Sequence, residues 1–323
     1  MVSWGSLGRW LQGIDYKLVV PALAGMPLWA GEKLASLRGF FAWLLNHDWR
    51  YVASGSREAR ARTYQSMSII DPEAGPARLN WRTLRRFQHN SREEWQACLF
   101  NKKVMEKINN NSMVTGLEEL KYYRSQGRGV ILVSCHLDSF CMGMVLLGLQ
   151  GLPVHVINTS EIENPVIHPN VREFYQAKYR AMENLMHGRM AYYQTEMDHF
   201  REVLKHGEMV TLMGDVPGSR STIYIPFLGR LFRMPLGAWH LARETDSALG
   251  AYVCVREGTG RYRVICMNPG EILSDDPKQS LLPVYDFLEK WIRRMPERWI
   301  SADLLSGFPQ LPADEREQDR CGT

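Results

Sequence analysis

One histidine stands where an apolar run gives way to a helical segment. Within GVILVSCHLDSFCMG, residues 129–143, the apolar run ends at Cys135 and His136 follows directly. The next run, MGMVLLGLQ, predicts a helix, for which Asp138 or Ser139 is the expected N-cap. Because α/β proteins place catalysts at the carboxyl ends of their strands, His136 is a candidate general base, with a structural histidine as the alternative.

A second polar stretch follows another predicted strand. EMVTLM runs into Asp215, and the loop after it, PGSRS at 217–221, contains Arg220. PFLGR at 226–230 comes next, and PLG at 235–237 opens a further helix. Exposed N–H groups of a Gly-containing loop and a guanidinium both favour anions, so the loop is a candidate phosphate site.

The elements that must position these residues follow from the hydrophobic pattern. Up to about residue 120, apolar residues recur at helical spacing, and DPEAGP at 71–76 predicts a turn between two helices. From 127 to about 272, short continuous apolar runs alternate with amphipathic segments, as expected of strands buried on both faces. The predicted strands are GVILVSCH, PVHVIN, EMVTLMGD, ALGAYVCV and YRVICMN.

This alternation predicts an α/β fold with a largely parallel central sheet flanked by helices. We expect one domain in three parts: a helical N-terminal region over 1–120, an α/β core over 121–310, and a disordered tail over 311–323. LLPVYDFLEKWIRRM is the expected closing helix of the core.

Composition excludes several classes of function. A net charge of +4, from 39 basic against 35 acidic residues, does not indicate a nucleic-acid-binding protein. The six cysteines contain no Cys-x-x-Cys pair and the histidines no ligand spacing, so we expect reduced thiols in the cytoplasm and no metal site. The cluster Arg82, Arg85 and Arg86 predicts a solvated helix face or a landing patch for an acidic partner.

A membrane contact is suggested by LVVPALAGMPLWA, from Leu18 to Ala30. This run is too short to span a bilayer, and it contains Pro21 and Pro27. It also lacks the basic start and the cleavage site of a signal peptide. We expect it to lie on a membrane or to pack in the core, and not to cross a membrane.

Taken in order, these stretches resemble the lysophospholipid acyltransferase superfamily, and within it the late lipid A acyltransferases. The resemblance rests on the strand–His136 turn, the Asp215 loop, PFLGR and PLG, and extends to Asn164–Pro165 and to RRMPERWIS near the end. It covers about residues 15 to 305. The family's fold and reaction are therefore expected here.

The resemblance implies acyl transfer from a thioester on coenzyme A or acyl carrier protein, with no bound cofactor. In the family a histidine, supported by an acid five residues later, deprotonates an acceptor hydroxyl or amine. The expected catalytic residues are His136, Asp138 and Cys141. The expected substrate-binding residues, with Arg220 on a phosphate or pantetheine-linked group of the donor, are Asn164, Asp215, Arg220, Gly229 and Arg230.

Cys141 is a departure from that pattern, because it stands where the family has Asp or Glu. Three alternatives remain open. Asp138 takes over the orienting role, or Cys141 is a nucleophile with His136 as its base, or the site is impaired. Taken alone, Asp138 is explained as a helix cap and Cys141 as a small buried residue.

Three hypotheses for the function follow, of which two are enzymatic and one is not. The leading reading is transfer to an amine or hydroxyl of a small acceptor in specialised-metabolite biosynthesis, because the arginine often found before Asn-Pro and the basic end of the family are absent. The alternatives are a lipid acyltransferase of the lipid A type at the inner membrane face, and a non-catalytic acyl-binding protein. The expected location is the cytoplasm, with peripheral contact at the inner membrane.

Overall fold

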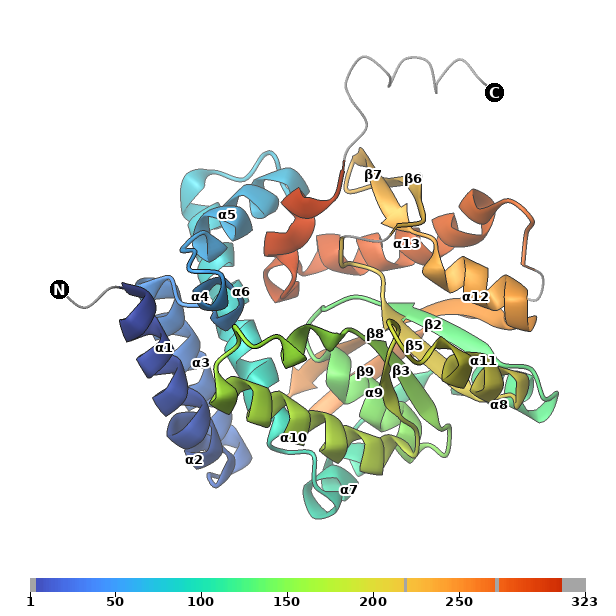
Figure 1. Ribbon diagram of the computed structural model, residues 1–323, viewed down its shortest axis with the longest axis horizontal. Helices are drawn as coiled ribbons and strands as arrows, with labels where there is room; N and C mark the ends of the chain where they lie inside the picture. Colours follow the sequence, from blue (N-terminus) through green and yellow to red (C-terminus); the bar gives the residue numbers. More distant parts are fainter. Residues whose placement is uncertain (1–3, 218–219, 271–272, 310–323) are drawn as a thin grey trace.

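The computed structural model describes residues 4–217, 220–270 and 273–309, so the predicted tail at 311–323 lies outside the described residues. A seven-stranded sheet has the order β1-β9-β8-β2-β5-β3-β4, and its neighbours are parallel except for β8 and β9 (Figure 1). The strands are β1 Met113–Thr115, β2 Val130–Ser134, β3 Val154–Asn158, β4 Met190–Tyr192, β5 Met209–Met213, β8 Ala248–Gly258 and β9 Arg261–Cys266. The predicted fold class is confirmed.

All five predicted strands are present, and β2 lies between β8 and β5. Its five residues are all buried, which explains why its sequence is continuously apolar. The pattern did not reveal β1 and β4, which are three residues long, nor the hairpin of β6 (Thr222–Phe227) and β7 (Arg230–Pro235). PFLGR is the turn region of that hairpin.

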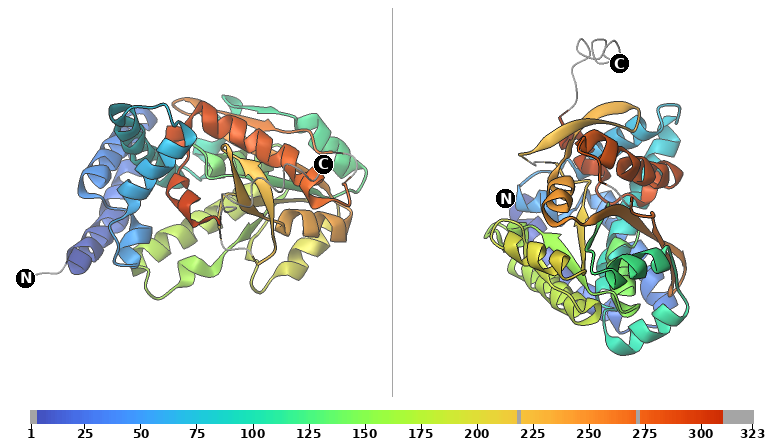
Figure 2. Two further views of the ribbon diagram at one scale, coloured as in Figure 1. Left: turned by 90° about the horizontal axis from the view of Figure 1, so that it is seen from above. Right: turned by 90° about the vertical axis from the view of Figure 1, so that its right-hand side faces the viewer.

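Helices cover both faces of the sheet and build the N-terminal region, which lies at one end of the molecule (Figure 2). Short helical turns are η1 Asp15–Val19, η2 Ser160–Glu163, η3 Pro296–Arg298 and η4 Ala302–Gly307. The α-helices are α1 Trp4–Ile14, α2 Val20–Ala24, α3 Leu28–Leu45, α4 Trp49–Ala53, α5 Ala59–Ile70, α6 Pro76–Ala97, α7 Lys102–Asn110, α8 Leu117–Ser125, α9 Phe140–Leu149, α10 Pro169–Met186, α11 Met197–Lys205, α12 Gly237–Thr245 and α13 Pro277–Arg294.

Helix α6 connects the N-terminal helices to the core, and it corrects one prediction. Arg86 is fully buried and binds Asp48, Asp303 and the carbonyl of Ile300. Arg82 is 7% exposed and binds Asp71. The prediction of a solvated basic face is wrong for both arginines, because their side chains are buried and their guanidinium groups are paired with carboxylates.

The run from Leu18 to Ala30 is divided among the end of η1, α2 and the start of α3. Across the part of the chain that the structure describes, no helix combines the length and the apolar character needed to cross a membrane.

Candidate active site

Two neighbouring parallel strands bring His136 and Asp215 together. Ser134, the last residue of β2, is in register with Met213, the last residue of β5, and each functional residue stands two positions after the end of its strand. The carbonyl of Ser134 also accepts a hydrogen bond from the N–H of Gly214, at 2.8 Å. Consequently the imidazole Nδ1 of His136 lies 2.8 Å from Oδ1 of Asp215. This arrangement is at the carboxyl edge of the sheet, where the sequence predicted the site.

Asp215 is 2% exposed and receives hydrogen bonds through both oxygens. Its Oδ2 accepts the backbone N–H of His136 at 2.8 Å and the indole N–H of Trp299 at 2.7 Å. Burial on its own would raise the pKa of Asp215, but the charge of His136 and these hydrogen bonds outweigh it, so the pKa is lowered. Asp215 is therefore an ionised carboxylate fixed in one orientation.

The ring of His136 has one nitrogen committed and one available. With Nδ1–H donating to the Asp215 carboxylate, the neutral tautomer has its lone pair on Nε2. The side chain is 24% exposed, and the edge of its ring packs on Phe140 with centroids 4.7 Å apart. An oriented and partly accessible imidazole backed by a carboxylate is the arrangement of a general base.

The segment 298–300 packs against the turn that carries His136. The N–H of Ile300 donates to the carbonyl of His136, and the N–H of Asp138 donates to the carbonyl of Arg298, both at 2.8 Å. Between these bonds Trp299 is fully buried and reaches Asp215. The closing segment thus fixes both members of the pair, although no periodic pattern in the sequence indicated this role for Trp299.

Asp138 is turned away from the imidazole. Its φ of 51° is in the left-handed region, and its Oδ2 accepts the N–H of Arg256 at 2.9 Å and Nη1 of Arg298 at 2.7 Å. Because Nδ1 of His136 is occupied by Asp215, the orienting role expected of Asp138 belongs in this geometry to Asp215. Asp138 instead anchors the turn that carries His136.

Cys141 lies in the first turn of α9, 5% exposed, beside the ion pair of Glu93 and Lys178. Lys178 Nζ and Glu93 Oε1 are 2.5 Å apart. Burial raises the pKa of the Cys141 thiol strongly, with Lys178 opposing the shift only in part. A thiol that is disfavoured as a thiolate is a poor nucleophile, so the surroundings of Cys141 favour the structural reading.

The other predicted substrate-binding residues are spread around the fold. Asn164 is exposed and closes the turn before α10, where its Oδ1 accepts the N–H of Val166 at 3.0 Å. Arg220 is exposed just before β6, and residues 218 and 219 of its loop lie outside the described part. Neither residue is linked to His136 by a direct contact within the described residues.

Gly229 and Arg230 belong to the turn of the β6–β7 hairpin. Leu228 and Gly229 have φ values of 51° and 78°, which a two-residue hairpin turn requires and which favour glycine. The N–H of Leu228 donates to Oε2 of Glu289 on α13, at 2.7 Å. The geometry accounts for Gly229 as a turn residue held against a helix, while Arg230 is exposed beside it.

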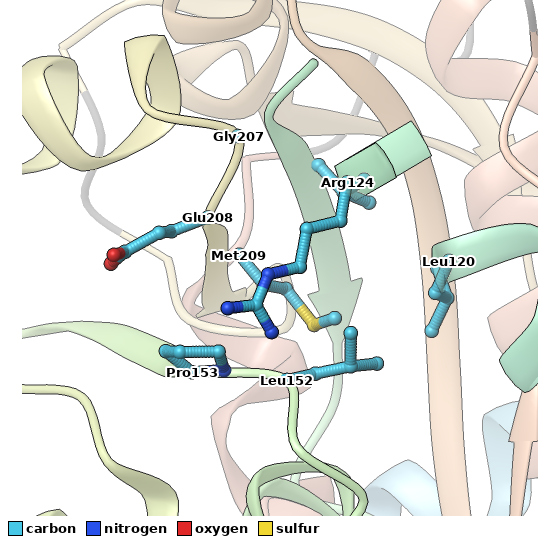
Figure 3. A pocket seen from close by; sticks show the side chains of 8 residues that line it. Leu120, Arg124, Leu152, Pro153, Gly207, Glu208 and Met209 are labelled. Atoms are coloured by element: carbon cyan, nitrogen blue, oxygen red, sulfur yellow. The ribbon is translucent and has the colours of Figure 1, made fainter. Parts of the chain in front are cut away.

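A small cavity lies at the opposite edge of the sheet and is not an alternative candidate for the active site. It lies at the amino ends of β2 and β5, next to Leu152 and Arg124 (Figure 3). Its volume is about 10 Å³, which holds about one water molecule. Across the described ranges, no three His, Cys, Asp or Glu side chains are grouped to hold a metal ion.

The family described as bacterial lipid A biosynthesis acyltransferase matches residues 72–301, more than two thirds of the chain. The chain belongs to this family. The matched segment contains every predicted catalytic and substrate-binding residue, together with Trp299.

Two curated members of the lipid A acyltransferase family show how distant the similarity is. A lipid A biosynthesis acyltransferase of Haemophilus influenzae is 23% identical over 207 residues, covering 64% of this chain and 61% of the relative. A lipid A biosynthesis lauroyltransferase of Escherichia coli is 26% identical over 191 residues, covering 58% of this chain and 59% of the relative. The similarity therefore spans about three fifths of the length of these relatives.

Membership of the lipid A acyltransferase family bears on the two enzymatic readings. The family description and both relatives favour the lipid acyltransferase alternative over transfer to a small specialised-metabolite acceptor. The small acceptor, and the roles of the individual residues, stay predictions.

Proposed function

We propose that this protein is a lipid acyltransferase that moves an acyl group from an acyl carrier protein thioester to a hydroxyl of a lipid A-type glycolipid. The observation that carries the proposal is the hydrogen bond between His136 Nδ1 and the buried carboxylate of Asp215. It lies within the segment that matches the family, at the edge of the sheet where a base is expected.

The proposed reaction uses His136 as base and then as acid. Nε2 removes the proton of the acceptor hydroxyl, and the oxygen attacks the thioester carbonyl to give a tetrahedral intermediate. Asp215 stabilises the imidazolium that forms. When the C–S bond breaks, the imidazolium returns its proton to the leaving thiolate. The products are the acyl ester and the free carrier thiol, and His136 is again neutral.

The proposed site of action is an anionic membrane surface, and the exposed side chains of the N-terminal helices support this proposal. On α3, Leu34, Leu37, Phe41 and Leu44 are 37 to 53% exposed, which leaves an apolar stripe without a partner in the described structure. Trp10, Leu18 and Trp29 add exposed apolar area nearby. Within residues 8–47, the exposed charged side chains are all basic: Arg9, Lys17 and Lys33. An apolar and cationic surface matches anionic lipid.

An acyl-transfer assay tests the proposed function. Purified protein is mixed with lauroyl carrier protein and either a lipid A precursor in anionic vesicles or a water-soluble amine, with His136→Ala as the inactive control. Transfer to the precursor alone, reduced at least about 100-fold in His136→Ala, is expected. Transfer to the soluble amine alone would support the small-acceptor reading instead. No transfer by a folded protein to either acceptor, with acyl coenzyme A also tried, would contradict the proposal.

A further inference from the structure

Four guanidinium groups surround His89, which is buried between α6 and the core. This four-arginine group consists of Arg85, Arg92, Arg256 and Arg298. Two of its members lie on the same face of α6 as His89, one turn before it and one turn after it, and the others come from β8 and η3. Burial lowers the pKa of His89 well below its usual range, and the charges of all four guanidinium groups lower it further, so the imidazole is neutral.

Positive charge is in excess within the four-arginine group. Two carboxylates contact its guanidinium groups. Asp138 accepts a hydrogen bond from Nη1 of Arg298 at 2.7 Å, and Glu32 of α3 forms ion pairs with Arg92 and Arg256. Burial is the main cause that lowers the pKa of Arg92, but a guanidinium stays protonated in proteins. Four cations in contact with two anions leave two positive charges, and protonation of either acid would only raise that excess.

The excess charge is accessible from solvent. The side chains of Arg256 and Arg298 are 21% and 29% exposed. Arg298 forms its hydrogen bonds through Nη1, so Nε and Nη2 have no partner among the described residues, and neither nitrogen is enclosed. Arg256 uses Nε and Nη2, which leaves Nη1 open in the same way, and Arg85 has Nη2 open. Each of these nitrogens can donate to an incoming anion.

We propose that the four-arginine group binds the phosphate monoester headgroup of a membrane lipid, with Arg256 and Arg298 as direct ligands and Arg85 adding charge. A phosphate monoester carries a charge of about −1.5 to −2 at pH 7, which matches the excess of two positive charges. Its three terminal oxygens can accept hydrogen bonds from several guanidinium groups at once. A carboxylate or a phosphodiester brings only a single negative charge.

The surroundings favour a lipid over a soluble phosphate. Trp29, one turn before Glu32 on α3, is 61% exposed, and Nζ of Lys33 lies 5.5 Å from the centroid of its ring. Exposed tryptophan and lysine side chains are typical of a membrane–water interface. A headgroup at the four-arginine group would therefore have interfacial side chains on the adjacent turns of α3.

The four-arginine group is also joined to the turn that carries His136. The N–H of Asp138 donates to the carbonyl of Arg298 at 2.8 Å, two residues after the catalytic histidine. A phosphate bound by Arg298 would thus lie at the same edge of the sheet as the proposed base. The assignment of this headgroup to the acyl acceptor rests on the proposed function.

Vesicle binding tests the site without any acyl transfer. The full chain is titrated by co-sedimentation with phosphatidylcholine vesicles that contain either phosphatidic acid, a phosphate monoester, or phosphatidylglycerol, a phosphodiester, at matched surface potential. Binding to the phosphatidic acid vesicles is expected to be at least about fivefold tighter. Arg256→Gln and Arg85→Gln should each reduce this preference to less than about twofold. Arg180→Gln removes an exposed cation of α10 outside the group, and this matched control is expected to keep the preference.

Equal binding to the two kinds of vesicle, or a preference that survives both substitutions, would overturn the proposal. Glucose 1-phosphate is added as a soluble phosphate monoester, and release of the protein from the vesicles at concentrations similar to that of the lipid phosphate would show that the lipid assignment is wrong. If Arg256→Gln does not fold, Arg85→Gln still decides, because it leaves the contacts of Asp138 and Glu32 in place. A failure of the proposed function in the acyl-transfer assay would leave the vesicle result unchanged, so the two failures are distinguishable.

Discussion

Nδ1 of His136 and Oδ1 of Asp215 are 2.8 Å apart, although 79 residues separate them in the sequence. Their proximity follows from the register of two parallel strands, since Ser134 pairs with Met213 and each functional residue stands two positions further on. Trp299 and the backbone of His136 hold the second carboxylate oxygen. The pair is thus positioned by the sheet and fixed by the closing segment of the core.

The Trp299 hydrogen bond to Asp215 is expected to affect the chemical step. Trp299→Phe keeps most of the ring volume but removes the N–H donor, so kcat should fall about tenfold with little change in KM. Trp239→Phe is the matched control, because it also removes an indole hydrogen bond, to the carbonyl of Ser274. Trp239 is distant in the sequence from His136 and Asp215, and its indole hydrogen bond goes to neither of them. Equal effects of the two substitutions on kcat would contradict the role of Trp299.

Cys141 is expected to be dispensable for turnover. Cys141→Ala should change kcat less than about threefold, since the buried thiol has a raised pKa and is a weak nucleophile. Intact mass measurement after mixing with acyl thioester should find no acyl-Cys141 species; a species formed and discharged at the rate of turnover would show the opposite.

Placing the acid that the family usually has at position 141 is expected to destabilise this protein. Cys141→Glu would bury a second carboxylate beside Glu93, which is already paired with Lys178. Thermal unfolding should show a lowered Tm. A Tm equal to that of the unmodified protein would mean that Lys178 serves both acids.

A substitution of Arg220 tests how the acyl donor is bound in the proposed reaction. If its guanidinium meets a phosphate of the carrier's pantetheine arm, Arg220→Ala should raise the donor KM about tenfold and leave the acceptor KM unchanged. Lys205→Ala, another exposed cation on the core, is the control. An unchanged donor KM would leave Arg220 as a surface residue.

The strands, and the positions of His136 and Asp215 just after two of them, could be predicted because they depend on local pattern. Continuous apolar runs indicated β2 and β5, and a polar residue follows each, although Asp215 was expected to bind substrate and not to pair with His136. What the sequence could not supply is which side chains meet across the sheet edge. Asp138 is nearer to His136 in sequence, yet its left-handed φ directs its carboxylate to Arg256 and Arg298.

The prediction of a solvated basic face on α6 was wrong for a related reason. Local composition cannot show that Asp48 and Asp303, both distant in sequence, neutralise Arg86 inside the protein. Trp299 likewise had no periodic signal, because it acts through one hydrogen bond and not through a face of a helix or strand.

The lowered pKa of Asp215 predicts how acid affects stability. Since its folded pKa lies below the unfolded value of about 4, the ionised carboxylate stabilises the fold above that pH, and the contribution is lost as pH falls through the folded pKa. The difference in free energy of unfolding between the unmodified protein and Asp215→Asn should therefore shrink on acidification below about pH 4. Denaturant titrations over that range measure it.

The most direct test of the central claim is the rate of acyl transfer by Asp215→Asn. The amide oxygen can keep the hydrogen bonds from Trp299 and the backbone of His136, but the amide nitrogen then faces Nδ1. That contact favours the tautomer with its proton on Nε2, which cannot accept one from the acceptor. We expect a folded protein whose kcat is at least about 100-fold lower. A folded Asp215→Asn variant with near-normal kcat would contradict that claim.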